Sequence, residues 1–318
     1  MRVLFASDGS SDATKAAQFI ATLAINNPVD LHVLTVSCAP ERLGPHSPSS
    51  FFSAWDEAEK KYVAELQSRL KDMFQPICDS LVMSRTIGPV SQSILDESVG
   101  MEADVIVMGA RGHSLVHRML LGSISDHVAS KAKCSVAVIR DRANTVDTLP
   151  SPTKLLAAFD RSKGSREAIA EVMKLQWGKE VGLNVLSIAP LPLPFENEGF
   201  APTAISWEPT YLDNIREEAE RVASQVAEKI PKCDVEIRRS NHPGDAIVGA
   251  AEESQTDLIF MGDTGHTLLD EWLLGSTSKY VLRHAPCSVW ISRHHRRSIQ
   301  SIEDIRERET NEMGTSTV

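Results

Sequence analysis

The sequence of 318 residues lacks the features that mark secreted, membrane or nucleic-acid-binding proteins. Its five cysteines form no Cys-x-x-Cys pair, and their odd number disfavours a disulfide framework or a zinc site. No apolar run reaches membrane-spanning length, and the apolar part of the opening MRVLFASDGS is too short for a signal peptide. A net charge of −10 disfavours broad binding to nucleic acid or to anionic membranes. These absences predict a cytoplasmic protein with no membrane or nucleic-acid partner.

Familiar motifs for phosphate chemistry and for metals are also missing. No G-x-x-x-x-G-K-[ST] loop occurs, and the S-G-G-x-D-S loop of ATP pyrophosphatases is replaced by SDGSSD, in which Asp8 breaks the pattern. His113 and His117 have helical i, i+4 spacing and His127 follows them, but no carboxylate or cysteine completes a ligand set. The sequence therefore predicts no metal site formed by the protein alone.

What the chain does have is extensive self-similarity. RVLFASDGS, which begins at Arg2, matches KLLAAFDRS, which begins at Lys154, and further matching pairs follow at a near-constant offset. Asp8 and Asp160, for example, are 152 positions apart. A constant offset of this length indicates two whole domains rather than a short structural repeat.

The predicted domains are residues 1–140 and 153–292, separated by the polar linker DRANTVDTLPSP at 141–152. The tail from 293 to 318 is charged and poor in apolar residues, which predicts disorder. Each domain alternates near-continuous Val, Ile and Leu runs with segments of helical period, as in a parallel sheet covered on both faces. The predicted fold class is α/β, with two tandem doubly wound, Rossmann-like domains of five parallel strands and four helices each.

Two stripes at helical spacing are predicted to face the cores. Each domain also has a long proline-rich loop after its second strand, at 38–53 and 189–206. Cys134 and Cys287 begin matching strands and are predicted to be buried thiols. The stripes are Tyr62, Leu66, Leu70 and Met73, and Tyr211, Ile215, Ala219, Val222 and Val226.

The strongest functional signal is a repeated glycine loop, GARGHSLVHRMLLGS from Gly109 and GDTGHTLLDEWLLGS from Gly262. Each copy follows a predicted fourth strand, and each first strand ends in an acid, Asp8 or Asp160. Ligands of doubly wound sheets bind at this carboxyl edge. Glycines allow close backbone approach, and N–H groups of the loop and the following helix favour a phosphate, while a carboxylate suits ribose hydroxyls. The alternative is that these glycines only end a strand and cap a helix, without binding a ligand. The presence of both the loop and the acid in each half disfavours this alternative.

At these residues the sequence resembles the universal stress protein family in its tandem form. The family's ATP-binding signature is Gly, two residues, Gly, nine residues, Gly and Ser or Thr, and both copies carry it. The resemblance covers about 1–140 and 153–292. It implies sheets of strand order 3-2-1-4-5 that bind ATP, with or without Mg²⁺. It also implies that the last strands, SVAVI and SVWIS, pair within one chain as an internal pseudo-dimer, with a homodimer of chains as a further alternative.

The resemblance gives roles to the main residues of the predicted site. Asp8 and Asp160 would bind ribose, Val36 and Ile188 would contact adenine, and the glycine-serine segments would hold phosphates. The full predicted nucleotide-binding set is Ser7, Asp8, Val36, Gly109, Arg111, Gly112, His113, Gly122, Ser123, Ile124, Ser125, Asp160, Ile188, Gly262, Gly265, His266, Gly275, Ser276, Thr277 and Ser278.

Charged residues distinguish the two loops. Arg111 in the first loop is a candidate phosphate partner, whereas the second loop carries Asp263 one position earlier. Arg161 and Lys163 follow the first strand of the second domain. We expect Asp263 to pair with one of them and to make the second site weaker for ATP. Solvation of all these side chains is the alternative.

The predicted function is an ATP-binding regulatory or stress-response module with little or no catalysis. A slow ATPase or phosphotransferase that uses the same site is the main alternative. A scaffold with empty sites is a further one, although both halves keep the motif.

Overall fold

The computed structural model describes residues 1–38, 49–112, 121–140, 152–191, 208–263 and 274–293. The first half contains β1 (Arg2–Ala6), α1 (Ser11–Asn26), β2 (Asp30–Ser37), α2 (Ser49–Phe74), β3 (Ser80–Ile87), α3 (Val90–Gly100), β4 (Val105–Gly109), α4 (Ser123–Lys131) and β5 (Ser135–Ile139). The second half contains β6 (Lys154–Ala158), α5 (Lys163–Lys174), β7 (Gly182–Ala189), α6 (Glu208–Ala227), β8 (Lys232–Arg239), α7 (Pro243–Ser254), β9 (Leu258–Gly262), α8 (Ser276–His284) and β10 (Ser288–Ser292). The predicted α/β class is confirmed.

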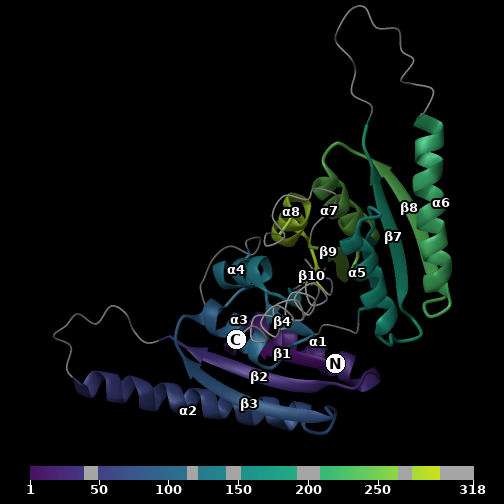
Figure 1. Ribbon diagram of the computed structural model, residues 1–318. Helices are drawn as coiled ribbons and strands as arrows, with labels where there is room; N and C mark the ends of the chain where they lie inside the picture. The colour runs from purple at the N-terminus through teal and green to yellow at the C-terminus, as the bar shows by residue number, and fades with distance from the viewer. Residues whose placement is uncertain (39–48, 113–120, 141–151, 192–207, 264–273, 294–318) are drawn as a thin grey trace, which may run out of the picture.

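The ten strands of the described residues form one sheet, in the order β3-β2-β1-β4-β5-β10-β9-β6-β7-β8. Each half contributes five strands in the order 3-2-1-4-5, and pairing within each half is parallel. The halves join where β5 and β10 pair antiparallel, with Val138 opposite Val289 and Val136 opposite Ile291. Figure 1 shows the halves meeting at this seam, with α2 and α6 at opposite ends of the molecule.

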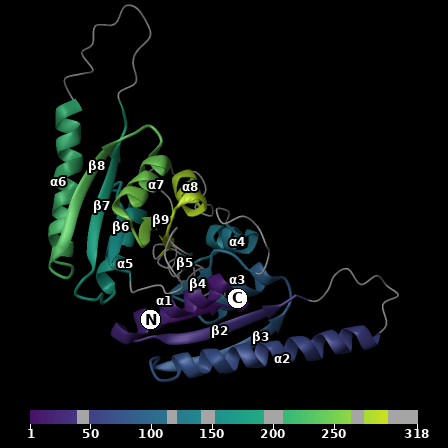
Figure 2. The same cartoon turned by 180° about the vertical axis from the view of Figure 1, so that it is seen from behind.

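Two buried hydrophobic clusters cover the two faces of the sheet, and each runs through both halves. Helices α1, α2, α5 and α6 contribute to one cluster, and α3, α4, α7 and α8 to the other, an arrangement that Figure 2 shows from behind. The Phe260 and Trp290 rings stack with centroids 5.2 Å apart, and Phe19 of the first half meets Trp290 edge-on at 6.4 Å. These three rings therefore link the two halves within one of the clusters.

The predicted stripes are buried in part. Leu66 and Leu70 are buried, as are the last four residues of the second stripe, but Tyr62 and Met73 are each 37% exposed. Met73 lies in the last turn of α2, and the Tyr62 hydroxyl reaches the main chain beyond β1, so neither enters the core. Helix α2 begins at Ser49, inside the predicted loop 38–53. Residues 49–53 contain neither Gly nor Pro, so nothing in them disfavours a helix.

Arg293 corrects the predicted start of the disordered tail. Its side chain is 0% exposed, and its main-chain N–H donates to Ser135 Oγ at 3.0 Å. The prediction was wrong at this residue because the β5–β10 pairing holds the chain just beyond the end of β10. Residues 294–318 and most of the linker, 141–151, lie outside the described residues.

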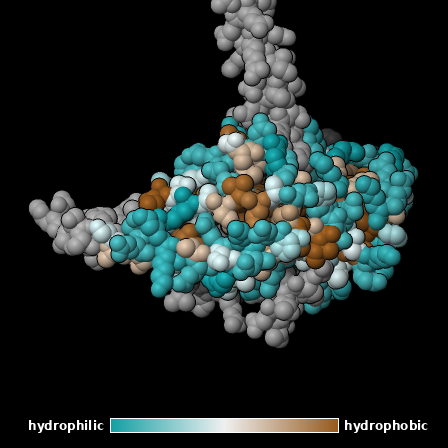
Figure 3. Space-filling model, turned by 90° about the horizontal axis from the view of Figure 1, so that it is seen from below, coloured by the Kyte–Doolittle hydropathy of each residue, from teal (hydrophilic) through white to brown (hydrophobic). Residues whose placement is uncertain are grey.

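No helix in the described ranges is both long and apolar enough to cross a bilayer. The five cysteines are free thiols, and Cys134 and Cys287 are buried as predicted. The hydrophobic residues on the face drawn in Figure 3 lie in small patches separated by hydrophilic surface.

Replacing Trp290 tests whether packing at the seam contributes to the free energy of unfolding. Trp290 is 1% exposed, and its Nε1 donates to Glu171 at 2.7 Å. Trp290→Ala leaves a cavity and removes a donor from a buried carboxylate, so we expect a loss of about 3–5 kcal/mol in the free energy of unfolding, measured by urea denaturation. The control Ile25→Ala, at a side chain 72% exposed, should change it by less than about 0.5 kcal/mol. A loss for Trp290→Ala no larger than the control's would contradict this view of the seam.

Candidate functional site

A cavity of about 370 Å³ opens at the carboxyl ends of β6, β7 and β9. Around it the chain brings together Asp160 after β6, Ile188 on β7, Gly262 at the end of β9, and residues 275–278 at the start of α8. These segments lie far apart in sequence and meet because parallel strands of order 3-2-1-4-5 place their carboxyl ends on one edge. The volume falls within the ~300–1,000 Å³ usual for small-molecule sites.

Hydrogen bonds fix the walls of this cavity. Asp160 Oδ1 accepts from the Ser162 N–H at 3.0 Å, which turns the chain into α5. Ser278 Oγ donates to the Gly262 carbonyl at 2.8 Å, and the Gly275 N–H donates to the Asp263 carbonyl at 2.7 Å. The glycine loop therefore leaves β9 and returns beside it, so that α8 begins against the strand end.

The glycines at these strand ends are required by space. A Cβ on Gly109 would lie 2.7 Å from the main-chain carbon of Asp12, and a Cβ on Gly262 would overlap the backbone of Gly164. The N-cap residues of α4 and α8, Gly122 and Gly275, have no side chain to accept from the first N–H groups. Those donors are available to an anion at the positive end of each helix.

The first half repeats this geometry. Asp8 Oδ1 accepts from the Ser10 N–H at 3.0 Å, and a Cβ on Gly112 would lie 2.6 Å from Asp8 Oδ2. The glycine loop thus lies directly against the acid that follows β1. Ser125 Oγ donates to the Gly109 carbonyl at 2.9 Å, as Ser278 does in the second half. Of the remaining predicted residues, Ser7 is buried, Val36, Gly122 and Ile124 are half-buried, and Ser123 is exposed.

The loops that follow β1 and β6 differ directly after the acid, where the chain has a positive φ in both halves. Gly9, with φ 77°, is replaced in the second half by Arg161, with φ 69°. The Tyr62 hydroxyl donates to the Asp8 carbonyl at 2.9 Å, and a Cβ on Gly9 would overlap it. In the second half the Arg161 guanidinium instead lies 5.8 Å from the centre of the Tyr211 ring.

Tyr211 and Ile215 line the cavity, although the sequence assigned both to the core. The signal that could have found Tyr211 is that both helical stripes begin with Tyr. Arg161 lines the cavity as well, and its Nε lies 4.0 Å from Glu218 Oε2. The second site therefore has a cation and an aromatic ring at its wall.

The predicted pairing of Asp263 with Arg161 or Lys163 is wrong. Asp263 is fully buried, and its Oδ2 lies 3.2 Å from Nε of Arg293, which is also fully buried. Lys163 lies 4.0 Å from a carboxylate oxygen of Glu167 instead. The Asp263 side chain lies at the seam because its partner, Arg293, directly follows β10 there. Since its charge is neutralised away from the cavity, the argument for a weaker second site falls.

Arg111 also differs from its predicted role. It forms a bidentate ion pair with Asp12, with Nε 2.8 Å from Oδ2 and Nη2 3.1 Å from Oδ1. The Asp12 side chain is nearly inaccessible, so this pair ties the glycine loop to the first turn of α1. The guanidinium therefore braces the loop rather than standing free for a phosphate.

Three predicted site residues, His113, Gly265 and His266, lie outside the described residues, as does His117. In the part of the chain that the structure describes, no three His, Cys, Asp or Glu side chains gather as a metal site would require.

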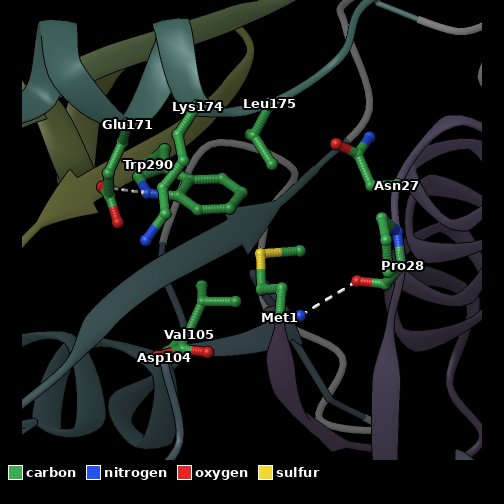
Figure 4. Close-up of a pocket in the computed structure, with 9 residues that line it drawn as sticks. All are labelled: Met1, Asn27, Pro28, Asp104, Val105, Glu171, Lys174, Leu175 and Trp290. Carbon is green, nitrogen blue, oxygen red and sulfur yellow. Dashed lines mark hydrogen bonds between the residues drawn. The ribbon is translucent and has the colours of Figure 1, made fainter.

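A second cavity, of about 260 Å³, lies on the opposite edge of the sheet, between the halves (Figure 4). Lys174, at the end of α5, and the next residue, Leu175, face Met1, just before β1, and Val105, where β4 begins, with Trp290 between them. No predicted site residue lines it. Glu171, which stands where the first half has Phe19, also lines it and accepts from Ser135 Oγ and Trp290 Nε1, each at 2.7 Å, and from Ser292 Oγ.

Comparisons with known proteins agree with this architecture. The model of the universal stress protein family matches residues 1–140 and 152–293. A universal stress protein of Mycobacterium tuberculosis is 25% identical over 295 residues, which cover 90% of this chain and 95% of that protein. One of Methanothermobacter thermautotrophicus is 46% identical over 57 residues, only 18% of this chain and 38% of that protein.

One solved structure shows the same fold across nearly the whole chain, and another resembles less than half of it. A universal stress protein from Archaeoglobus fulgidus has a TM-score of 0.60 at 22% identity, with 92% of this chain and 96% of that chain covered. A universal stress protein solved in complex with cAMP covers 44% of this chain and 97% of that chain, at 20% identity and a TM-score of 0.33.

Adding a methyl group at a strand end tests the close packing of the site. In Gly109→Ala the new Cβ meets main-chain atoms of α1, which cannot rotate away, so we expect a loss of about 1–3 kcal/mol in unfolding free energy by chemical denaturation. Gly178→Ala, where nothing lies within 4 Å of the new Cβ, is the control and should change it by less than about 0.5 kcal/mol. Equal effects at the two glycines would contradict the close approach.

Proposed function

Because the chain belongs to the universal stress protein family, we propose that it binds ATP at the carboxyl edge of each half, as part of a stress-response role. The observation that carries this proposal is the cavity that gathers Asp160, Ile188 and the start of α8. Its donors and acceptors are those that a nucleotide needs, and its walls are largely apolar.

The residues of the second half divide between the parts of a nucleotide. The Asp160 carboxylate would accept hydrogen bonds from ribose hydroxyls. Ile188 and Ile247, which both line the cavity, offer apolar contact to a base. The main-chain N–H groups from Ser276 to Ser278, at the helix N-terminus, and the hydroxyls of Ser276 and Thr277 would hold phosphates. ATP supplies the negative charge that this end favours.

The first half supports the same proposal through matched geometry. Asp8 lies against the glycine loop, and Ser125 ties α4 to the end of β4 as Ser278 ties α8 to β9. Mg²⁺, if bound, would come with the phosphates, since neither site brings a cluster of carboxylates among the described residues. Two binding sites per chain follow.

The cellular setting and assembly complete the proposal. Five free thiols suit a reducing compartment, so we place the protein in the cytoplasm. The β5–β10 pairing lets one chain act as an internal pseudo-dimer. The proposed domains are 1–140 and 153–292, with Arg293 added to the second.

Aspartate variants test ATP binding. Asp160→Ala removes the ribose acceptor of the second half and Asp8→Ala that of the first, so each should weaken ATP binding at its own site by about 10- to 100-fold in calorimetric titration. Asp234→Ala and Asp72→Ala, at exposed positions, remove the same charge and should leave both sites unchanged.

Parallel titrations with ADP and cAMP, and an assay for released ADP, separate binding from hydrolysis. ATP affinity that is unchanged in both site variants, or no binding of ATP by the unmodified chain, would overturn the proposal. Steady release of ADP that the site variants abolish would favour a slow ATPase at the same site.

A further inference from the structure

Arg140 and Arg293 occupy equivalent positions, each directly after the last strand of its half and 153 residues apart. Because β5 and β10 are antiparallel, each strand ends beside the beginning of the other. That beginning is also where the last helix of the other half ends. The seam therefore delivers each arginine to a helix C-terminus that belongs to the opposite half.

The hydrogen bonds follow this crossed pattern. Arg140 of the first half donates from Nη2 to the Leu282 carbonyl at 2.6 Å and from Nη1 to the Ala285 carbonyl at 3.0 Å, both at the end of α8. Arg293 of the second half donates from Nη2 to the Ala129 carbonyl in α4 at 2.6 Å. Leu282 and Ala129 are themselves equivalent, 153 positions apart.

The main chains cross in the same way. The Arg140 N–H donates to Ser288 Oγ at 3.3 Å, and the Arg293 N–H donates to Ser135 Oγ at 3.0 Å. Each serine begins the last strand of the opposite half. The two arginines thus form a reciprocal clamp, defined here as Arg140 on α8 and Arg293 on α4.

Burying a guanidinium at the end of a helix costs free energy, because the charged group loses its hydration. Burial lowers the pKa of Arg140 to about 10, so the group stays charged at neutral pH. Within the described ranges no carboxylate lies at ion-pair distance from Arg140, so the carbonyls at the negative end of α8 supply its counter-charge. Arg293 has Asp263 as well as the α4 carbonyl.

The clamped helices are those whose N-termini form the phosphate ends of the two candidate sites. Each is nine residues long, so its two ends lie only about two turns apart. We infer that Arg140 and Arg293 are positioning residues in trans: each holds the phosphate-binding helix of the opposite half, so neither nucleotide site is complete without the other half. This inference rests on the proposed function for its ligand but on the clamp for its geometry.

The asymmetry of the clamp adds a direct connection between the sites. Asp263, whose carbonyl accepts from the Gly275 N–H, belongs to the glycine loop of the second half. Its carboxylate holds Arg293, and Arg293 holds α4 of the first half. The first half has Ala110 at the equivalent position. Asp263 and Arg293 therefore connect the end of β9, beside the second site, to α4, whose N-terminus lies at the first site.

The test measures each site alone. Asp8→Ala leaves the second site as the reporter, and Asp160→Ala leaves the first. Into each reporter chain we place Arg140→Met or Arg293→Met and titrate ATP. We expect Arg140→Met to weaken the second site about fivefold and the first less than twofold, and Arg293→Met to do the reverse.

Arg283→Met is the matched control. Arg283 also crosses between halves, to Asp126 of α4, with Nη2 2.8 Å from Oδ2, but its side chain is 46% exposed. Exposed ion pairs of this kind contribute little, so we expect less than a twofold change at either site. A general loss of stability would weaken both reporters alike and would not produce the crossed pattern.

Lysine variants and hydrogen exchange test the clamp where a methionine variant or ATP binding fails. If a methionine variant fails to fold, the Arg140→Lys or Arg293→Lys variant, which keeps the charge and one donor, should show the same crossed pattern with a smaller loss. If the unmodified chain binds no ATP, the proposed function falls, and hydrogen exchange then tests the clamp. Arg140→Met should speed exchange at the end of α8 and not of α4, and Arg293→Met the reverse. Effects confined to the arginine's own half, equal in both halves, or absent would overturn the inference.

Discussion

The antiparallel pairing of β5 with β10 is the constraint on which the rest of the molecule depends. It converts two five-stranded sheets into one sheet of ten strands and lets each hydrophobic cluster run through both halves. It also decides what stands at the ends of the two strands. Ser135 of β5 donates to Glu171 of the second half across the seam, and Arg140 and Arg293 reach helices of the opposite half.

The two candidate sites arise from the same constraint in a different way. Parallel order within each half places an acid, a glycine loop and a helix N-terminus on one edge, whichever residues fill the loops. What the side chains add is bracing. Arg111 and Asp12 tie the first loop to α1, whereas Asp263 and Arg293 tie the second loop to the seam. The halves thus share a backbone geometry and differ in how it is held.

Much of this could be read from the sequence, for identifiable reasons. Val, Ile and Leu runs at a constant offset predict a repeated parallel sheet, and glycines at the same spacing in both halves predict the loops. Partners of individual charges could not be read, because they depend on where distant strand ends meet. Asp263 was paired with residues near it on the expected edge, and Arg293 was assigned to the tail. Tyr211 was assigned to the core because helical period does not say where a stripe passes the end of a sheet.

The central claim is that both halves hold a nucleotide, and native mass spectrometry of the full chain titrated with ATP tests it most directly. The account predicts species with one and then two ATP molecules per chain, with the doubly bound form dominant at saturation. The Asp8→Ala, Asp160→Ala double variant should need about 10- to 100-fold more ATP to reach the same occupancy. No bound ATP at high ATP concentration, or unchanged binding in the double variant, would contradict the account.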